Sequence, residues 1–186
     1  KEISREPTPL SEQELQQLRE LLSSSAPVRP AALSAEEHFL RGNAYYEIED
    51  YDSAVIEYSV SIRVAPNHAE VYNNRGVAFG LKNKHDKAIE DYDQAIRLNP
   101  DYADAYNNRG EAYRHKREHD RAIKDYDLAI RLNPNLAEAY NNRAIAYDDK
   151  GEHDRAIDDY DQAIRLNLDD PSAYIGRSDA FNNMKK

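Results

Sequence analysis

Apolar and small residues recur along most of this chain at the spacing of helices packed in pairs. Between residues 103 and 136, Tyr106, Gly110 and Tyr113 are spaced i, i+4 and i+7, which places them on one face of a helix. A second helical stripe follows, made of Ala122, Ile123, Tyr126, Ala129 and Ile130. It ends at Asn133-Pro134, because proline cannot continue a helix. The pattern predicts a helix–turn–helix hairpin.

The hairpin pattern repeats every 34 residues. Tyr106-Asn107-Asn108-Arg109 recurs as Tyr72-Asn73-Asn74-Arg75 and as Tyr140-Asn141-Asn142-Arg143, and Arg41 and Arg177 continue the arginine series. We divide this region, residues 35–186, into units 35–68, 69–102, 103–136 and 137–170, followed by a half unit, 171–183, which we expect to form a capping helix. Repeat units bury their apolar faces only against their neighbours, which excludes most enzyme folds.

Residues 1–34 precede the repeats and do not follow the 34-residue pattern. Leu15, Leu18, Leu21 and Leu22 predict one short amphipathic helix over residues 8–22, with Ser11 and Glu14 as its capping box. Three serines and two prolines between residues 23 and 30 indicate a linker or an extended strap.

Charge and composition limit the classes of partner. The 186 residues carry a net charge of −10, and the negative charge lies mostly in the repeats. An acidic surface disfavours binding to nucleic acids and to anionic membrane surfaces. The chain lacks cysteine and has no apolar run of about 18 residues, so we expect neither thiolate chemistry nor a membrane span. We expect a cytoplasmic location, and a chain that begins with Lys1 fits an excised piece of a longer protein.

The units resemble tetratricopeptide repeats. That family has aromatic and small residues at fixed positions and a closing proline, matched in the third unit by Tyr106, Gly110, Tyr113, Ala122, Tyr126, Ala129 and Pro134. The second unit matches with Tyr72, Gly76, Phe79, Ala88, Tyr92, Ala95 and Pro100, whereas the fourth has Leu168 in place of the proline. The resemblance covers about residues 35–183. It implies an all-α, right-handed α-solenoid of tandem helix–turn–helix hairpins, with the first helices lining a concave groove.

An asparagine recurs at a groove position of this family, as Asn74, Asn108 and Asn142. Some family members use such a ladder to hold a peptide by its backbone, and an amide can donate and accept at once. The preceding residues Asn73, Asn107 and Asn141 could share that role. The alternative is that these asparagines merely recur in similar repeats and bind water.

Specificity must come from groove positions that differ between units. By resemblance, the candidate peptide-binding residues at these positions are Asn43, Tyr46, Val77, Leu81, Glu111, Arg114 and Ile145. They make the expected groove apolar in patches and acidic towards its C-terminal end. We therefore expect a protein or peptide partner that is basic and carries apolar anchors.

Relatives that bind the acidic C-termini of heat-shock chaperones use a clamp of lysine and arginine. This chain has Asp104 or Glu138 at the place of the clamp lysine, and Asn108 or Asn142 at that of the arginine. We therefore expect no carboxylate clamp.

Other polar repeats have structural interpretations. His85, His119 and His153 stand on different hairpins, so they share no metal centre. The recurring arginine is a departure from the family, which usually has leucine at that position. We expect Arg75, Arg109 and Arg143 to form ion pairs with acids in the Asp-Tyr-Asp run of their own hairpin's second helix. Asp52, Asp86, Asp120 and Asp154 mark the start of the second helices, where we expect them to cap free N–H groups.

The sequence thus predicts a scaffold for protein–protein interaction that binds a peptide segment. No catalytic, cofactor or metal motif is present in it, and we expect no enzyme activity. The alternative is self-association, either between copies or by docking of the N-terminal helix into the groove.

Overall fold

The computed structural model describes residue 16 and residues 33–167 and 169–185. The predicted amphipathic helix and strap therefore lie, apart from Gln16, outside the described residues. The chain divides into two compact units, residues 1–98 and 99–186, which we describe separately.

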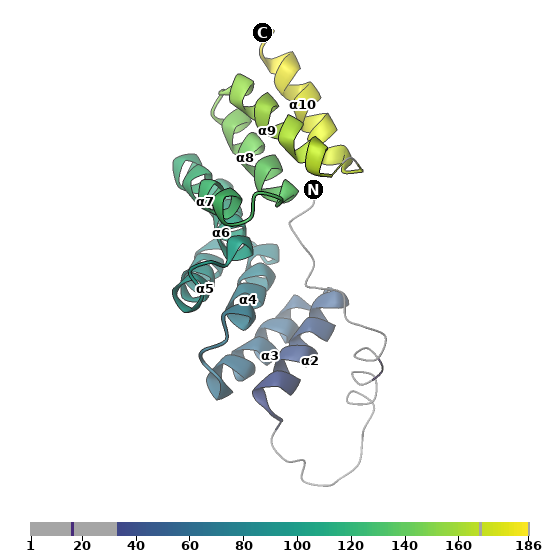
Figure 1. The fold of residues 1–186 in the computed structure, drawn as a ribbon. Coiled ribbons are helices and arrows are strands. Elements are labelled where there is room, and N and C mark those ends of the chain that lie inside the picture. Colours follow the sequence, from purple (N-terminus) through teal and green to yellow (C-terminus); the bar gives the residue numbers. More distant parts are fainter. Residues whose placement is uncertain (1–15, 17–32, 168, 186) are drawn as a thin grey trace. The chain divides into compact units, whose positions relative to one another are not determined.

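The described residues form helices joined in hairpins (Figure 1). Unit one contains α2 (Ala35–Glu47) with α3 (Tyr51–Val64) and α4 (Ala69–Leu81) with α5 (His85–Leu98). Unit two contains α6 (Ala103–His115) with α7 (His119–Leu132), α8 (Ala137–Asp149) with α9 (His153–Leu166), and α10 (Pro171–Asn183). Each first helix packs against its second helix, while α3 contacts α4, α7 contacts α8, and α9 contacts α10. The expected all-α fold of tandem helical hairpins is confirmed.

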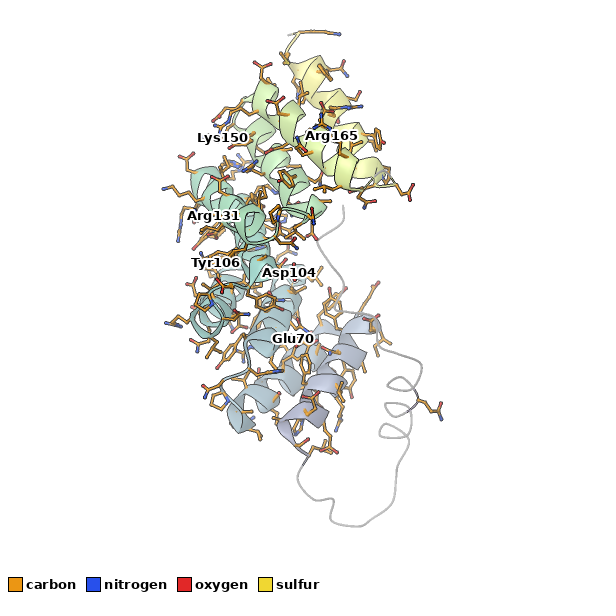
Figure 2. All side chains as sticks on the ribbon, in the orientation of Figure 1. Glu70, Asp104, Tyr106, Arg131, Lys150 and Arg165 are labelled. Atoms are coloured by element: carbon orange, nitrogen blue, oxygen red, sulfur yellow. The ribbon has the colours of Figure 1, made fainter. Side chains whose placement is uncertain are left out.

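Charges at the helix ends complement the helix dipoles. The second helices have Asp in their first turn and Arg in their last, and Arg131 and Arg165 are examples of the latter (Figure 2). The expected capping role of these aspartates is wrong at Asp120, which lies inside α7 and accepts from Lys150 Nζ at 2.6 Å. In α3 the side-chain cap is instead Asp50, which accepts from the Ser53 N–H at 3.1 Å.

The turns between paired helices share one conformation. Glu49, Asn83, Arg117 and Gly151 stand 34 residues apart and all have positive φ, between 55° and 78°. In the third hairpin, the N–H of Glu118 bonds to the carbonyl of Tyr113 at 2.9 Å, which closes the end of the helix. Only Gly151 adopts this left-handed conformation without strain.

Close approach of paired helices depends on a tyrosine ring lying against a glycine. A Cβ placed on Gly110 would lie 2.7 Å from Tyr126 Cε1, and Gly42 and Gly76 face their own hairpins' tyrosines similarly. The fourth hairpin carries Ala144 at this position. Its tyrosine, Tyr160, instead lies against Gly176 of α10, where a Cβ would be 2.5 Å from Tyr160 Cζ. Gly176 occupies the position that holds Asn142 one repeat earlier.

We therefore expect Gly176→Asn to destabilise the protein, although it restores the residue of the repeat. The new side chain would overlap Tyr160, and overpacking of this kind costs about 1–3 kcal/mol. Adding Ala144→Gly should recover much of this loss, because it gives the ring the space that glycine provides in the other hairpins. Urea denaturation followed by circular dichroism measures both effects.

Ser178→Asn provides the control, because this residue is exposed on the same helix. A Gly176→Asn variant as stable as the parent chain would contradict the explanation.

Candidate peptide-binding faces

The predicted binding residues lie on the first helices, at spacings that align them on one face within each unit. In unit one this first-helix face carries Asn43, Tyr46, Asn73, Asn74, Val77 and Leu81, from α2 and α4. In unit two it carries Asn107, Asn108, Glu111, Arg114, Asn141, Asn142 and Ile145, from α6 and α8. Contacts between α2 and α4, and between α6 and α8, bring these residues together within each unit.

The asparagines of unit one hydrogen-bond to one another. Asn74 Nδ2 donates to Asn43 Oδ1 at 3.3 Å, and Asn73 Nδ2 donates to Asn74 Oδ1 at 3.3 Å. Asn43 Oδ1 also accepts from the Tyr58 hydroxyl at 2.7 Å. This hydroxyl is buried, and burial raises the pKa of Tyr58 well above its usual value. The network ties the first-helix face to the second helix α3.

Unit two has a related network with a different partner at its edge. Asn142 Nδ2 donates to Asn107 Oδ1 at 3.1 Å, and Asn107 Nδ2 donates to Glu138 Oε1 at 2.9 Å. Asn141 Oδ1 is buried without a hydrogen-bond partner among the described residues. Its counterpart Asn107 bonds to the next asparagine, Asn142, but the residue one repeat further is Gly176. The network therefore ends at α10.

The asparagines are more buried than their predicted role implies. Asn74 and Asn142 are 9% and 7% exposed, respectively, and their amides bond first to neighbouring side chains. An amide has two N–H donors and one oxygen with two lone pairs. Within the described residues Asn142 makes one hydrogen bond, which leaves its oxygen and one N–H for a ligand.

The apolar candidates differ in accessibility. Tyr46 is buried and packs edge-on against Tyr51, with ring centroids 5.5 Å apart, and Val77 is also buried. Leu81 and Ile145 are half-buried. A ligand would therefore meet these last two side chains first.

Glu111 changes the electrostatics of unit two. It stands where unit one has Asn43 and Val77, and its side chain is only 8% exposed. Its carboxylate lies 3.8 Å from His115 Nε2 and 4.0 Å from Arg114 Nη2. Arg114 Nη1 lies 4.0 Å from Asp149 Oδ2. Sequence analysis identified Glu111 and Arg114 but not this burial, which depends on packing around the helix.

Three arginines anchor the first helices to the rest of their hairpins. Arg75 Nε and Nη2 donate to the carboxylate of Asp91 at 2.8 and 2.6 Å. The same paired bonds join Arg109 to Asp125 and Arg143 to Asp159, at 2.7 Å each. The predicted arginine–aspartate pairing is confirmed.

The Arg75–Asp91 ion pair is costly to bury. Burial raises the pKa of Asp91, although the hydrogen bonds and charge of Arg75 lower it. A carboxyl whose pKa is raised by folding adds stability below its ordinary pKa and loses that contribution as pH rises through the folded value. The pair therefore fixes geometry more than it stabilises at neutral pH.

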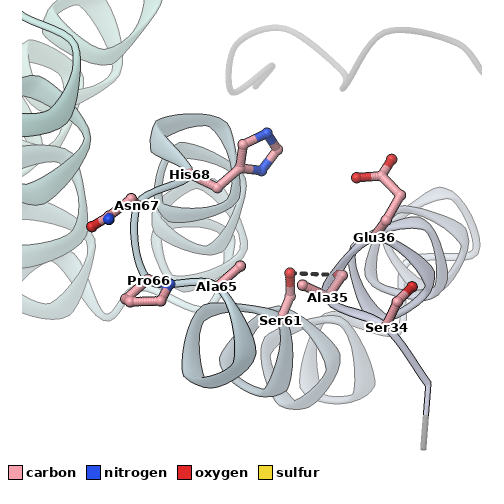
Figure 3. Close-up of a pocket in the computed structure, with 8 residues that line it drawn as sticks. All are labelled: Ser34, Ala35, Glu36, Ser61, Ala65, Pro66, Asn67 and His68. Atoms are coloured by element: carbon pink, nitrogen blue, oxygen red, sulfur yellow. Dashed lines mark hydrogen bonds between the residues drawn. The ribbon is translucent and has the colours of Figure 1, made fainter.

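A separate depression in unit one lies away from these faces. It is lined by Ser34, Ala35, Glu36, Ser61, Ala65, Pro66, Asn67 and His68, and the Ser61 hydroxyl donates to the Ala35 carbonyl across it at 2.7 Å (Figure 3). None of the predicted binding residues lines it. Across the described residues, no group of His, Cys, Asp or Glu is arranged to hold a metal ion, and no helix is long and apolar enough to cross a membrane.

Two models of repeat families match the helical hairpins of this chain. A family model described as TPR repeat matches residues 42–83 and 81–116, and one described as tetratricopeptide repeat matches residues 103–136 and 137–170. The chain belongs to the tetratricopeptide repeat family. Such repeats generally mediate protein–protein interaction and are generally non-catalytic. A search of curated proteins finds no match.

Solved structures of other tetratricopeptide repeat proteins are similar. A crystal structure of MamA is 27% identical, with a TM-score of 0.71 over 81% of this chain and 82% of MamA. The first repeat domain of Spaghetti (RPAP3), bound to the HSP90 peptide SRMEEVD, is 28% identical, with a TM-score of 0.62 over 66% of this chain and 98% of that one. YrrB, a repeat protein with an unusual peptide-binding site, shares the fold at 19% identity, with a TM-score of 0.71 over 89% of this chain and 86% of YrrB.

We expect Arg75→Leu to lower the free energy of unfolding, because it leaves the buried carboxylate of Asp91 without its guanidinium. Breaking one side of a buried pair costs about 3–5 kcal/mol. Arg75→Leu/Asp91→Ala should recover a large part of the loss, since no buried charge remains. Chemical denaturation compares the variants.

Arg97→Leu is the matched control, because this arginine is exposed in the last turn of α5. If the double variant is no more stable than Arg75→Leu, the unpaired carboxylate is not the cause.

Proposed function

We propose that this repeat protein is an interaction scaffold whose first-helix faces bind a peptide segment of a partner. The observation that carries the proposal is the row of asparagine amides on these faces, held in position by hydrogen bonds to one another. Amides held in this way can bond to a peptide backbone without regard to its sequence. The complex of RPAP3 with an HSP90 peptide supports peptide binding by a repeat domain of similar fold.

The charges of the faces favour a basic partner with apolar anchors. Glu70 in unit one and Asp104 in unit two lie near the start of their first helices (Figure 2). Asp148 and Asp149 add negative charge near the end of α8. Opposite charge on a partner would speed association and select against acidic segments. Leu81 in unit one and Ile145 in unit two would each receive an apolar side chain of the partner.

Selection from a library of random displayed peptides tests the proposal with a defined probe. We expect the enriched peptides to combine Lys or Arg with apolar residues. The triple variant Asn74→Ala, Asn108→Ala, Asn142→Ala should bind them at least about tenfold more weakly, since hydrogen bonds that form only on binding are lost. Fluorescence anisotropy of a labelled peptide measures the affinity, and circular dichroism verifies folding.

The control is Glu90→Ala, Lys124→Ala, Asp158→Ala, at one shared exposed position of the second helices. If the asparagine variant and this control bind the peptides with equal affinity, the asparagines are not part of the binding site.

The same faces should not bind a free acidic C-terminus. Asp104 and Glu138 stand at the places of the clamp lysine, and their carboxylates would repel one. We expect the peptide SRMEEVD, which RPAP3 binds, to show no saturable binding in isothermal titration calorimetry. Saturable binding at low salt would contradict the assignment of a basic partner.

Self-association is the alternative function. Its predicted element, the leucine-bearing helix over residues 8–22, lies outside the described residues apart from Gln16. Light scattering distinguishes self-association from peptide binding, because self-association would increase the measured molar mass as the protein concentration rises.

A further inference from the structure

The environment of the repeated arginine differs at the last copy. In the internal copies, Nε and Nη2 bind an aspartate of the second helix that follows, as in Arg143 with Asp159. Nη1 points the other way, to the preceding hairpin: Arg75 reaches Ser59 at 2.9 Å and Arg143 reaches Asp127 at 2.5 Å. Arg75 and Arg143 thus each join two second helices within one unit.

Arg177 of α10 makes only half of these contacts. Its Nη1 donates to Asp161 of α9 at 2.5 Å, as the pattern requires. Its Nε and Nη2 have no hydrogen-bond partner among the described residues. The side chain is 33% exposed, compared with 19% for Arg143. The edge of the guanidinium that binds an aspartate in the other copies is therefore available.

The apolar side chains beside Arg177 are also uncovered. Tyr174 is 39% exposed, Ile175 61% and Phe181 47%. Phe181 is the counterpart of Tyr147, which is buried under Arg155 of its own second helix, with the guanidinium 3.9 Å from the ring centroid. An outer capping surface would be polar. The surface of α10 made of Tyr174, Ile175, Arg177, Ser178 and Phe181, here called the α10 face, instead resembles the surface that the first helices of the other hairpins turn towards their second helices.

We propose that the α10 face binds an amphipathic helix of a partner protein, in the manner of a second helix. The internal hairpins define the chemistry of that helix: an Asp followed by an aromatic residue, with Ala three residues before and four residues after the Asp. In α7 these are Asp125, Tyr126, Ala122 and Ala129. The partner's Asp accepts from Nε and Nη2 of Arg177, and its aromatic ring lies over Ser178, the counterpart of Ala144.

The charge of Arg177 distinguishes this partner from a general apolar helix. A bidentate arginine–carboxylate contact fixes both position and rotation, so a helix without the Asp would lose register as well as affinity. This surface shares no residue with the asparagine network, so we expect binding at one surface to be independent of binding at the other.

A labelled synthetic peptide of residues 117–134 of this chain, which contains the α7 pattern, is the probe. We expect saturable binding to the full chain by fluorescence anisotropy. Arg177→Gln in the protein, or the counterpart of Asp125→Asn in the peptide, should each weaken binding by about tenfold, since a charge-assisted bidentate contact is lost. Combining both changes should weaken it little further, because they remove the same contact.

Two protein variants serve as controls, and Ile175→Asp serves as the disrupting variant. Arg165→Gln removes an exposed arginine of α9 and should leave the affinity unchanged, as should the asparagine triple variant. Ile175→Asp should abolish binding while circular dichroism shows a folded chain, because this side chain is exposed. Absence of saturable binding, or binding unaffected by Arg177→Gln, would overturn the proposal.

A second copy of the chain is the competing occupant. If light scattering of the unliganded chain shows a dimer that Ile175→Asp dissociates, the α10 face is an interface between copies and the assignment to a partner helix is wrong. A monomer that binds the probe supports the assignment.

Discussion

The buried arginine–aspartate pair is the constraint on which the positions of α4, α6 and α8 depend. Its carboxylate lies on the second helix and its guanidinium on the first, so the paired hydrogen bonds fix the two helices against rotation. The preceding residue is the asparagine of the row, about 100° further around the helix. Turning the arginine into the hairpin therefore turns Asn74 or Asn142 towards the preceding first helix, where the amide bonds form.

Much of the fold could be predicted from the sequence because repetition makes local signals unambiguous. Helical spacing and prolines located the hairpins, and opposite charges at a shared period indicated the ion pairs. The hydrogen bonds among the asparagines could not be predicted, because a polar residue at a groove position is expected to be exposed to solvent and not bonded to its neighbours. Burial of Asn142 and Glu111 results from packing between neighbouring helices, which a single helix does not encode. The capping role expected of Asp120 failed because α7 begins one residue earlier, which places Asp120 inside the helix, where its carboxylate accepts from Lys150.

The two units show how one backbone arrangement can support different chemistry. Asn43 is neutral and accepts from Tyr58 and Asn74, whereas its counterpart Glu111 brings a buried charge among Arg114 and His115. The four repeats carry Asn43, Val77, Glu111 and Ile145 at that position, on first helices of equal length. The scaffold and the selectivity of its faces are therefore separable properties of the sequence.

The left-handed residues of the turns have a further consequence. Glu49, Asn83 and Arg117 hold a backbone conformation that disfavours side chains, each at a cost of roughly 1 kcal/mol. Since unrelated side chains occupy the same turn position, the conformation of the turn is determined by the tertiary contacts of the hairpin and not by the residue at that position. The identity of that residue is thus free to drift between copies. The side chains of the turns between paired helices can change in charge and size without any adjustment of the helices they join.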